Sequence, residues 1–508
     1  MKAIILNVSA ALVIAGLLAA SGCTDTAPSG PSASLGSVTV TKYVAIGNSL
    51  TAGYQSNGLY ESAQIYSYPN LISQQLNAAG ANLPAFQQPL WPDPGTPSSA
   101  TSGVASRYVI ISMNGPVVGP ANEAITALAP LNAATLARPY DNLGVPGAVI
   151  YDFLDTSSFA SKAGAPRNNP LFEAILRTPA FGNSILAQAT ALNPDLVTFW
   201  LGNNDVLGYA TSGGTSPAAP TDPAIFAQLY GGSLTLLHQA LPKAKILAAN
   251  IPDVAAIPFF TTIGPKLAAA FKQVKAVEPA AVGIFYEKSG EYVASSYTTF
   301  TAPATDPLIT LEAGPYAPLL GQPTGQWYRD VAALEGAPIS AVYTFYSSKG
   351  IDTTQPFGLD PRNPIPDALV LDAGEQTIAT NAITAFNATI ANVVANTSGA
   401  VVVDMNSFFN SVKTNGLSVN GQTFTTAYIA GGLFSLDGVH PSSKGYGIVA
   451  NQYIKAMNDK LGMHVPYVNI NNLPGIPTPP LSKAHGVQYP NIPLSAWKSF
   501  HTLWGSEN

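Results

Sequence analysis

The chain has 508 residues, of which 47% are hydrophobic and only 10% are charged, and its formal net charge is −6. This composition allows a large folded core and excludes disorder over most of the chain. Lys and Arg form no cluster, which argues against nucleic acid as a partner because phosphate binding needs concentrated positive charge.

The first 23 residues have the pattern of an export signal. Lys2 is followed by the apolar run 3–20, then by two small residues and Cys23, the single cysteine of the chain. The segment resembles a bacterial lipoprotein signal, in which Cys23 becomes the lipidated first residue, although Ala20 stands where that signal usually has Leu. We expect a cell-envelope protein with an N-terminal lipid anchor, at the outer membrane or the periplasmic face. The alternative is an ordinary secretory peptide, a secreted protein and an incidental cysteine.

Residues 24–40 are rich in Ser, Pro, Gly and Thr and predict a flexible tether. From residue 41 to about 461, short apolar runs alternate with helix-like segments, which is the pattern of a parallel α/β sheet. We expect the central strands at five apolar runs, namely Tyr43–Ile46, Tyr140–Gly144, Leu196–Leu201, Lys245–Asn250 and Ala400–Asp404.

Two helices are indicated by apolar residues at helical spacing. One runs from about Ile378 to Val393, before the last predicted strand, and Glu375 suits its first turn. The other runs from about Tyr446 to Met457.

Two insertions, at about 55–137 and 255–366, interrupt this core and are expected to form a cap or a small subdomain. Within the second, the pattern predicts a helix at Leu267–Val277 and a strand at Ile339–Phe345. Residues 462–508 are expected to pack on the surface of the domain.

The segment Gly47-Asn48-Ser49-Leu50 follows the first predicted strand directly. Functional groups of a parallel sheet gather at the carboxyl ends of its strands, and a helix start favours an anion. Ser49 is therefore a candidate nucleophile, although a helix N-cap serine fits the same position. Similar tetrapeptides at Ser184 and Ser233 follow no strand that we can identify.

Two further strand ends offer hydrogen-bond donors. Gly202-Asn203-Asn204-Asp205 follows the predicted strand Leu196–Leu201, and the Asn204 amide is a suitable donor to an oxyanion. Gly147 closes the loop after the second predicted strand, and a glycine lets its N–H approach a ligand closely. Either segment is equally compatible with a plain turn.

Asp437 and His440 are three residues apart, so that they lie on one side of a turn. The carboxylate would accept a hydrogen bond from the imidazole and fix its tautomer, as a catalytic base requires. The alternative is an Asp turn beside an exposed histidine. No Asp stands three residues before any other histidine of the chain, which are His238, His464, His485 and His501.

In this order the four segments resemble the conserved blocks of the SGNH, or GDSL, hydrolase family, over about residues 41–461 without the insertions. The resemblance extends to 51–54 and Asp205, but Asn48 stands where the family usually has Asp. It implies a flavodoxin-like three-layer α/β/α sandwich with a five-stranded parallel sheet. It also implies ester hydrolysis through an acyl-enzyme. Ser49 would be the nucleophile, His440 the base and Asp437 its partner, while the N–H groups of Ser49 and Gly147 and the Asn204 side chain would form the oxyanion hole.

We therefore expect a serine ester hydrolase acting on a lipid or an acetylated carbohydrate. The chain has no Walker-type loop, H-E-x-x-H motif or Cys/His cluster, so we expect neither a cofactor nor a metal ion. The alternative is a surface-anchored binding or structural lipoprotein whose esterase site is vestigial.

Overall fold

In the computed structural model, the chain is described for residues 32–99, 102–112, 117–165, 167–215, 219–288, 291–295, 307–476 and 489–502. Cys23, the export signal and the first part of the expected tether lie outside the described residues. Ser34, near the start of the described chain, pairs with His464 just after the last long helix.

A parallel sheet of five strands forms the centre, in the order β11-β6-β5-β1-β4. Every residue of β1, β4 and β5 is buried, as expected for strands covered on both faces. Each strand lies within two residues of its predicted range, so the predicted sheet is confirmed. The bounds are Tyr43–Gly47 (β1), Asn142–Gly144 (β4), Leu196–Trp200 (β5), Lys245–Ala249 (β6) and Ala400–Val403 (β11).

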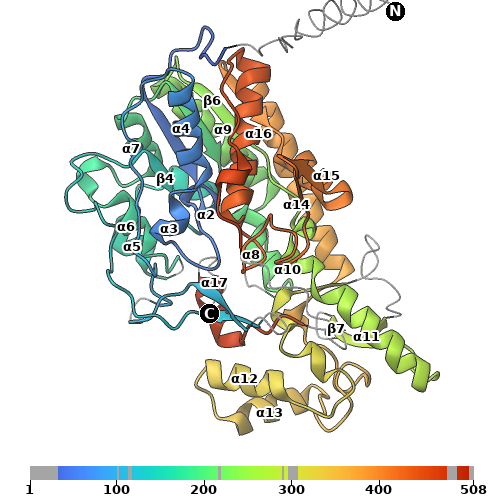
Figure 1. Cartoon of the computed structure of the whole chain (residues 1–508). Helices are drawn as coiled ribbons and strands as arrows, with labels where there is room; N and C mark the ends of the chain where they lie inside the picture. Colours follow the sequence, from blue (N-terminus) through green and yellow to red (C-terminus); the bar gives the residue numbers. More distant parts are fainter. Residues whose placement is uncertain are drawn as a thin grey trace, which may run out of the picture.

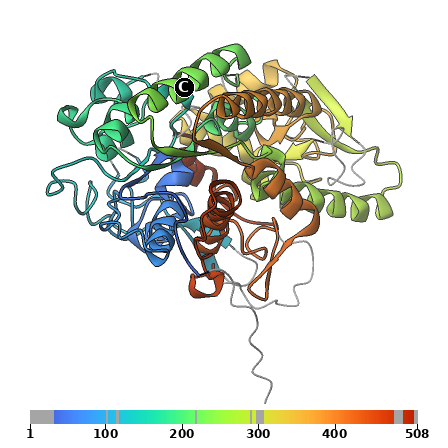
Figure 2. The same cartoon turned by 90° about the horizontal axis from the view of Figure 1, so that it is seen from above.

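Helices cover both faces of the sheet, which confirms the predicted α/β/α sandwich (Figures 1 and 2). One layer contains α4 (Tyr68–Ala78) and α16 (Ser443–Leu461), which pack against each other. The opposite layer contains α7 (Ile185–Ala191), α9 (Pro223–Ala240) and α14 (Ala373–Ala395). Helix α4 packs with α16 although it falls inside the segment expected as the first insertion.

Two neighbouring residues of β5 show how the sheet binds its two layers. Successive side chains of a strand point to opposite faces. The ring of Trp200 packs edge-on against Tyr68 of α4 and Tyr453 of α16. The ring of Phe199 packs instead against Phe153 and against Tyr230 of α9.

Helix α14 contains the predicted helix 378–393 and begins with reciprocal caps. Asp372 accepts a hydrogen bond from the N–H of Glu375, and the Glu375 carboxylate accepts one from the N–H of Asp372. By length and composition α14 would suffice to cross a membrane, but it packs against α9 and β11 of the sandwich. The second predicted helix lies within α16.

The predicted strand at Ile339–Phe345 is wrong, because this segment forms helix α13 (Ile339–Ser348). Its β-branched and aromatic residues imitate a strand locally, but tertiary contacts decide the outcome. Tyr346 packs on Trp327 and Tyr328, with ring centroids 6.0 and 4.4 Å apart. These partners lie on α12 (Gln326–Leu334), so that α12 and α13 form a helical hairpin remote from α4 and α7 (Figure 1).

The remaining elements are helices and two-stranded sheets around the sandwich. The helices are α2 (Ser49–Ala52), α3 (Glu61–Gln64), α5 (Phe159–Ala163), α6 (Leu171–Leu176), α8 (Asn204–Thr211), α10 (Pro258–Thr261), α11 (Ile263–Val277), α15 (Met405–Asn415) and α17 (Leu494–Thr502). The strand pairs are β2 (Tyr108–Ser112) with β3 (Val117–Pro120), β7 (Ile284–Lys288) with β8 (Glu291–Ser295), β9 (Leu308–Ile309) with β10 (Val370–Leu371), and β12 (Leu417–Val419) with β13 (Gln422–Phe424).

The C-terminal segment packs on the body in two places. Residues 468–473 contact α16, where side-chain atoms of Leu473 and Ile470 leave no room for a Cβ on Gly447. Helix α17 returns to the hairpin β2–β3, and its Trp497 is fully buried between the rings of Tyr108 and Phe259.

Candidate active site

The four segments singled out in the sequence lie at the carboxyl-terminal edge of the sheet. Ser49 is the first residue of α2, just after β1, and Asn204 is the first residue of α8, just after β5. Gly147 lies in the loop after β4, which pairs with β1. His440 precedes α16. The topology therefore gathers groups from four separate parts of the chain at one edge.

Ser49, His440 and Asp437 form one hydrogen-bonded chain. Ser49 Oγ lies 2.9 Å from His440 Nε2, although 391 residues separate the two. His440 Nδ1 lies 3.0 Å from Asp437 Oδ2. A carboxylate can only accept, so Nδ1 carries the proton and Nε2 is left to accept from the serine hydroxyl. The proximity expected from the sequence is confirmed, and this geometry suits removal of a proton from a serine.

Asp437 is fully buried and accepts hydrogen bonds on both oxygens. Oδ2 accepts from the His440 ring and from the Asn57 N–H at 2.9 Å. Oδ1 accepts from the Ser435 hydroxyl and from the N–H groups of Val439 and His440. Burial raises the pKa of Asp437, but His440 and these hydrogen bonds outweigh it and hold the pKa below its usual range. Asp437 therefore stays ionised beside the imidazole.

The loop Ser56-Asn57 after α2 binds this acid, and the sequence did not reveal it. Ser56 and Asn57 have φ of 50° and 61°, and these values turn their N–H groups toward the Ser435 hydroxyl and Asp437 Oδ2. The Asn57 side chain is held in turn by the Tyr54 hydroxyl and by contact with the carbonyl of Ala496 in α17. The dipeptide Asn57-Gly58 signals a turn, but no local pattern announces a contact 380 residues away.

Three groups at this edge can donate to an oxyanion. Within the described part of the chain, neither the Ser49 nor the Gly147 N–H donates a hydrogen bond. The Asn204 Nδ2 donates one proton to the Ala148 carbonyl at 2.9 Å, which leaves its second proton available. Gly147 has φ +77°, and the Ala148 N–H donates to the Val145 carbonyl. The segment is therefore a type II turn, in which the third residue is normally glycine.

Asn48, the position that departs from the family pattern, caps α2. Its Oδ1 accepts from the Leu50 N–H at 3.0 Å, as an Asp would. Its Nδ2 donates to Asn203 Oδ1 at 3.3 Å and so joins the first and third segments. A carboxylate at position 48 could only accept a hydrogen bond from Asn203, whereas the Asn48 amide donates one to it.

The other serines and histidines considered in the sequence have structural surroundings. Ser184 is the N-cap of α7, and Ser233 is buried inside α9. His238 lies in the last turn of α9, the His464 backbone pairs with that of Ser34, and His501 contacts Glu312. His485 lies outside the described residues.

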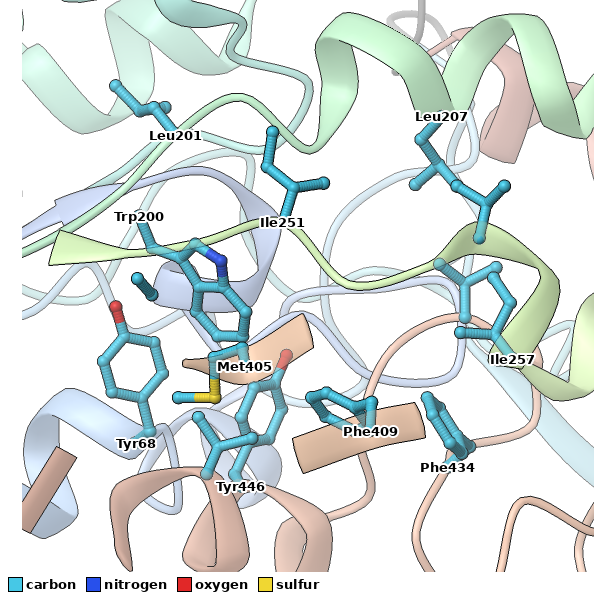
Figure 3. Packing of buried hydrophobic residues seen from close by; sticks show 14 of the residues in the cluster. Tyr68, Trp200, Leu201, Leu207, Ile251, Ile257, Met405, Phe409, Phe434 and Tyr446 are labelled. Atoms are coloured by element: carbon cyan, nitrogen blue, oxygen red, sulfur yellow. The ribbon is translucent and has the colours of Figure 1, made fainter. Parts of the chain in front are cut away.

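A small apolar pocket opens beside Ser49. Its cavity is about 60 Å³, and Ser49, Asn204 and His440 lie in its wall. In Figure 3 five apolar side chains of this wall lie around one space. They are Leu207, Ile251, Ile257, Phe409 and Phe434. Gly147 is outside the pocket wall. The turn that contains Gly147 is joined to the wall by the hydrogen bond from Asn204 to the Ala148 carbonyl.

Comparison with known proteins agrees with this architecture. A family model described as GDSL-like lipase/acylhydrolase matches residues 43–307, which contain Ser49, Gly147 and Asn204. No curated protein and no solved structure matches the chain. The match covers more than half of the chain, which therefore belongs to the GDSL-like lipase/acylhydrolase family of ester hydrolases.

Proposed function

We propose that the chain is a serine esterase that works through an acyl-enzyme on Ser49. The observation that carries the proposal is the continuous chain of hydrogen bonds from Ser49 Oγ through the His440 ring to the ionised Asp437. All three side chains are buried, and Ser49 and His440 border the one pocket wall that also contains Asn204.

The proposed reaction has two halves. His440 Nε2 takes the hydroxyl proton as Ser49 Oγ attacks the ester carbonyl carbon. The oxyanion accepts hydrogen bonds from the N–H groups of Ser49 and Gly147 and from Asn204 Nδ2, while Asp437 stabilises the imidazolium. His440 then protonates the leaving alcohol, and a water molecule repeats the sequence on the acyl-enzyme, which restores Ser49 and releases the acid.

The pocket supports an ester with a short, apolar acyl group. Its wall is mainly aliphatic and aromatic, and its cavity of about 60 Å³ holds only a few water-sized groups. A long fatty acyl chain needs more room. We therefore propose an acetyl to butyryl ester, which favours an acylated carbohydrate over a long-chain lipid as the substrate.

Turnover of p-nitrophenyl esters and labelling by a fluorophosphonate test this function. We expect the wild type to be labelled and to hydrolyse the acetate and butyrate, with much lower kcat/KM for the octanoate and for lysophosphatidylcholine. Ser49→Ala should lose label and turnover, whereas Ser233→Ala should keep both. A wild type without label or turnover would favour the binding or structural lipoprotein. Labelling of the Ser49→Ala variant would show that Ser49 is not the nucleophile.

For localisation we propose lipidation of Cys23 and attachment to the cell envelope. The support is the positive, apolar and small-residue pattern that ends at this cysteine. Metabolic labelling with an alkyne fatty acid should mark the wild type and not Cys23→Ser. A wild type that is cleaved and released without the lipid would identify an ordinary secretory peptide.

A further inference from the structure

Side chains bind the backbone of every residue from 146 to 150, the segment that contains most of the type II turn around Gly147. Each of these five consecutive residues binds one side chain through its carbonyl oxygen or its N–H. The pairs are Pro146 O with Asn169 Nδ2 at 2.7 Å, Gly147 O with Arg167 Nη2 at 3.4 Å, Ala148 O with Asn204 Nδ2 at 2.9 Å, Val149 N with Asp152 Oδ2 at 2.8 Å, and Ile150 N with Asp205 Oδ2 at 2.9 Å.

The bond from Asn169 to the Pro146 carbonyl holds the peptide group whose N–H is proposed to bind the oxyanion. The Pro146 carbonyl and the Gly147 N–H belong to the same peptide, at the centre of the type II turn. Type I and type II turns differ by a rotation of this central peptide, and the sequence Pro-Gly fits either. Rotation would turn the Gly147 N–H away from the side it now faces. Asn169 is therefore placed to decide which way the N–H points.

Asn169 is rigidly oriented for this purpose. Its side chain is buried, and its Oδ1 accepts from the N–H of Leu171 at 3.0 Å. An N–H can bind only the amide oxygen, so the amide nitrogen must face the Pro146 carbonyl. Its backbone N–H is fixed by the carbonyl of Lys162.

We propose that Asn169 is a positioning residue of the oxyanion hole. By binding the Pro146 carbonyl it keeps the central peptide in the type II orientation, so that the Gly147 N–H donates to the developing oxyanion. This inference rests on the proposed esterase function and concerns a residue that touches neither the substrate nor the triad.

The test uses the full chain and starts with the wild type, whose turnover of p-nitrophenyl acetate and fluorophosphonate labelling establish the esterase. Asn169→Ala should then lower kcat about 10-fold with little change in KM, because the hydrogen bond that biases the peptide is lost. Affinity for a trifluoromethyl ketone, which forms an oxyanion on Ser49, should fall in parallel with kcat.

Asn169→Asp separates positioning from folding. An ionised carboxylate repels the Pro146 carbonyl, whereas the protonated acid donates to it as the amide does. We expect kcat relative to wild type to be about 100-fold down at pH 8 and to recover at least 10-fold toward pH 5. Taking the ratio to wild type removes the pH dependence that the two proteins have in common.

Asn451 provides a matched control remote from the turn. It is buried, donates to the Val468 carbonyl and accepts from the Val468 N–H, the same pattern as Asn169. Asn451→Asp should lower thermal stability and leave the kcat ratio independent of pH. The inference is overturned if wild type turns over ester and Asn169→Asp shows a flat ratio, or if Asn451→Asp shows the same recovery. A wild type without turnover contradicts the esterase proposal instead.

Discussion

In the variant Asp437→Asn, one carboxylate oxygen becomes an NH₂ group. Oδ1 receives three hydrogen bonds, so the amide oxygen stays there and the amide nitrogen faces the His440 ring and the Asn57 N–H. His440 Nδ1 must then accept a hydrogen bond from the amide nitrogen, which puts the ring proton on Nε2, so that Nε2 can no longer act as the base toward Ser49. We expect kcat to fall by about 10⁴. The buried Asn57 N–H loses its acceptor, which should lower the free energy of unfolding by about 1–3 kcal/mol.

The assay combines steady-state hydrolysis of p-nitrophenyl acetate with urea unfolding. KM should change little, because the triad geometry is kept and only the tautomer is wrong. Asp372→Asn is the control, since this buried Asp caps α14 away from the site and Asn caps a helix equally well. A kcat within tenfold of the wild type for Asp437→Asn would refute the role of the carboxylate in setting the tautomer.

Four further outcomes are expected. Asn204→Ala should lower kcat for ester hydrolysis by about 10²–10³ at similar KM. An unchanged kcat would show that Asn204 does not donate to the oxyanion. Phe409→Ala should enlarge the pocket and raise the ratio of octanoate to acetate turnover about tenfold, whereas an unchanged ratio would place the acyl group elsewhere. Burial raises the pKa of Asp152 and Asp205 to about 6, so the folded state holds protons that the unfolded chain releases near pH 4. The free energy of unfolding by urea should therefore fall between about pH 4 and pH 6, by up to about 3 kcal/mol per group, and Asp205→Asn should flatten the fall. Trp497→Ala should lower the free energy of unfolding by about 3–5 kcal/mol and also reduce kcat, and a normal kcat would separate α17 from the site.

The sheet and the triad partners were predictable because their signals are local. Strands buried on both faces, such as β5, read as continuous apolar runs, and a polar motif directly after such a run marks the functional edge. Asp437 and His440 stand close enough in sequence to suggest a pair. The roles of these residues in catalysis remain predictions until the variants are measured.

The rest depends on contacts that no short window contains. Segment 339–345 has strand-like composition, but it lies in α13, a helix without buried residues that packs against α12 through Tyr346. Asn169 looks like any turn residue until the Pro146 carbonyl is seen beside it. Asn57 and Ala496 are 439 residues apart, so the support that α17 gives to the loop behind the acid is invisible in the sequence.

By this contact, the helix α17 supports a loop that lies just after the first family block. A product of premature termination before Ala496 would contain all four family blocks and would still be scored as a hydrolase by its motifs, yet the loop that orders its acid would have lost its outer contact. A variant that stops before Ala496 is accordingly expected to have a lower kcat than the full chain.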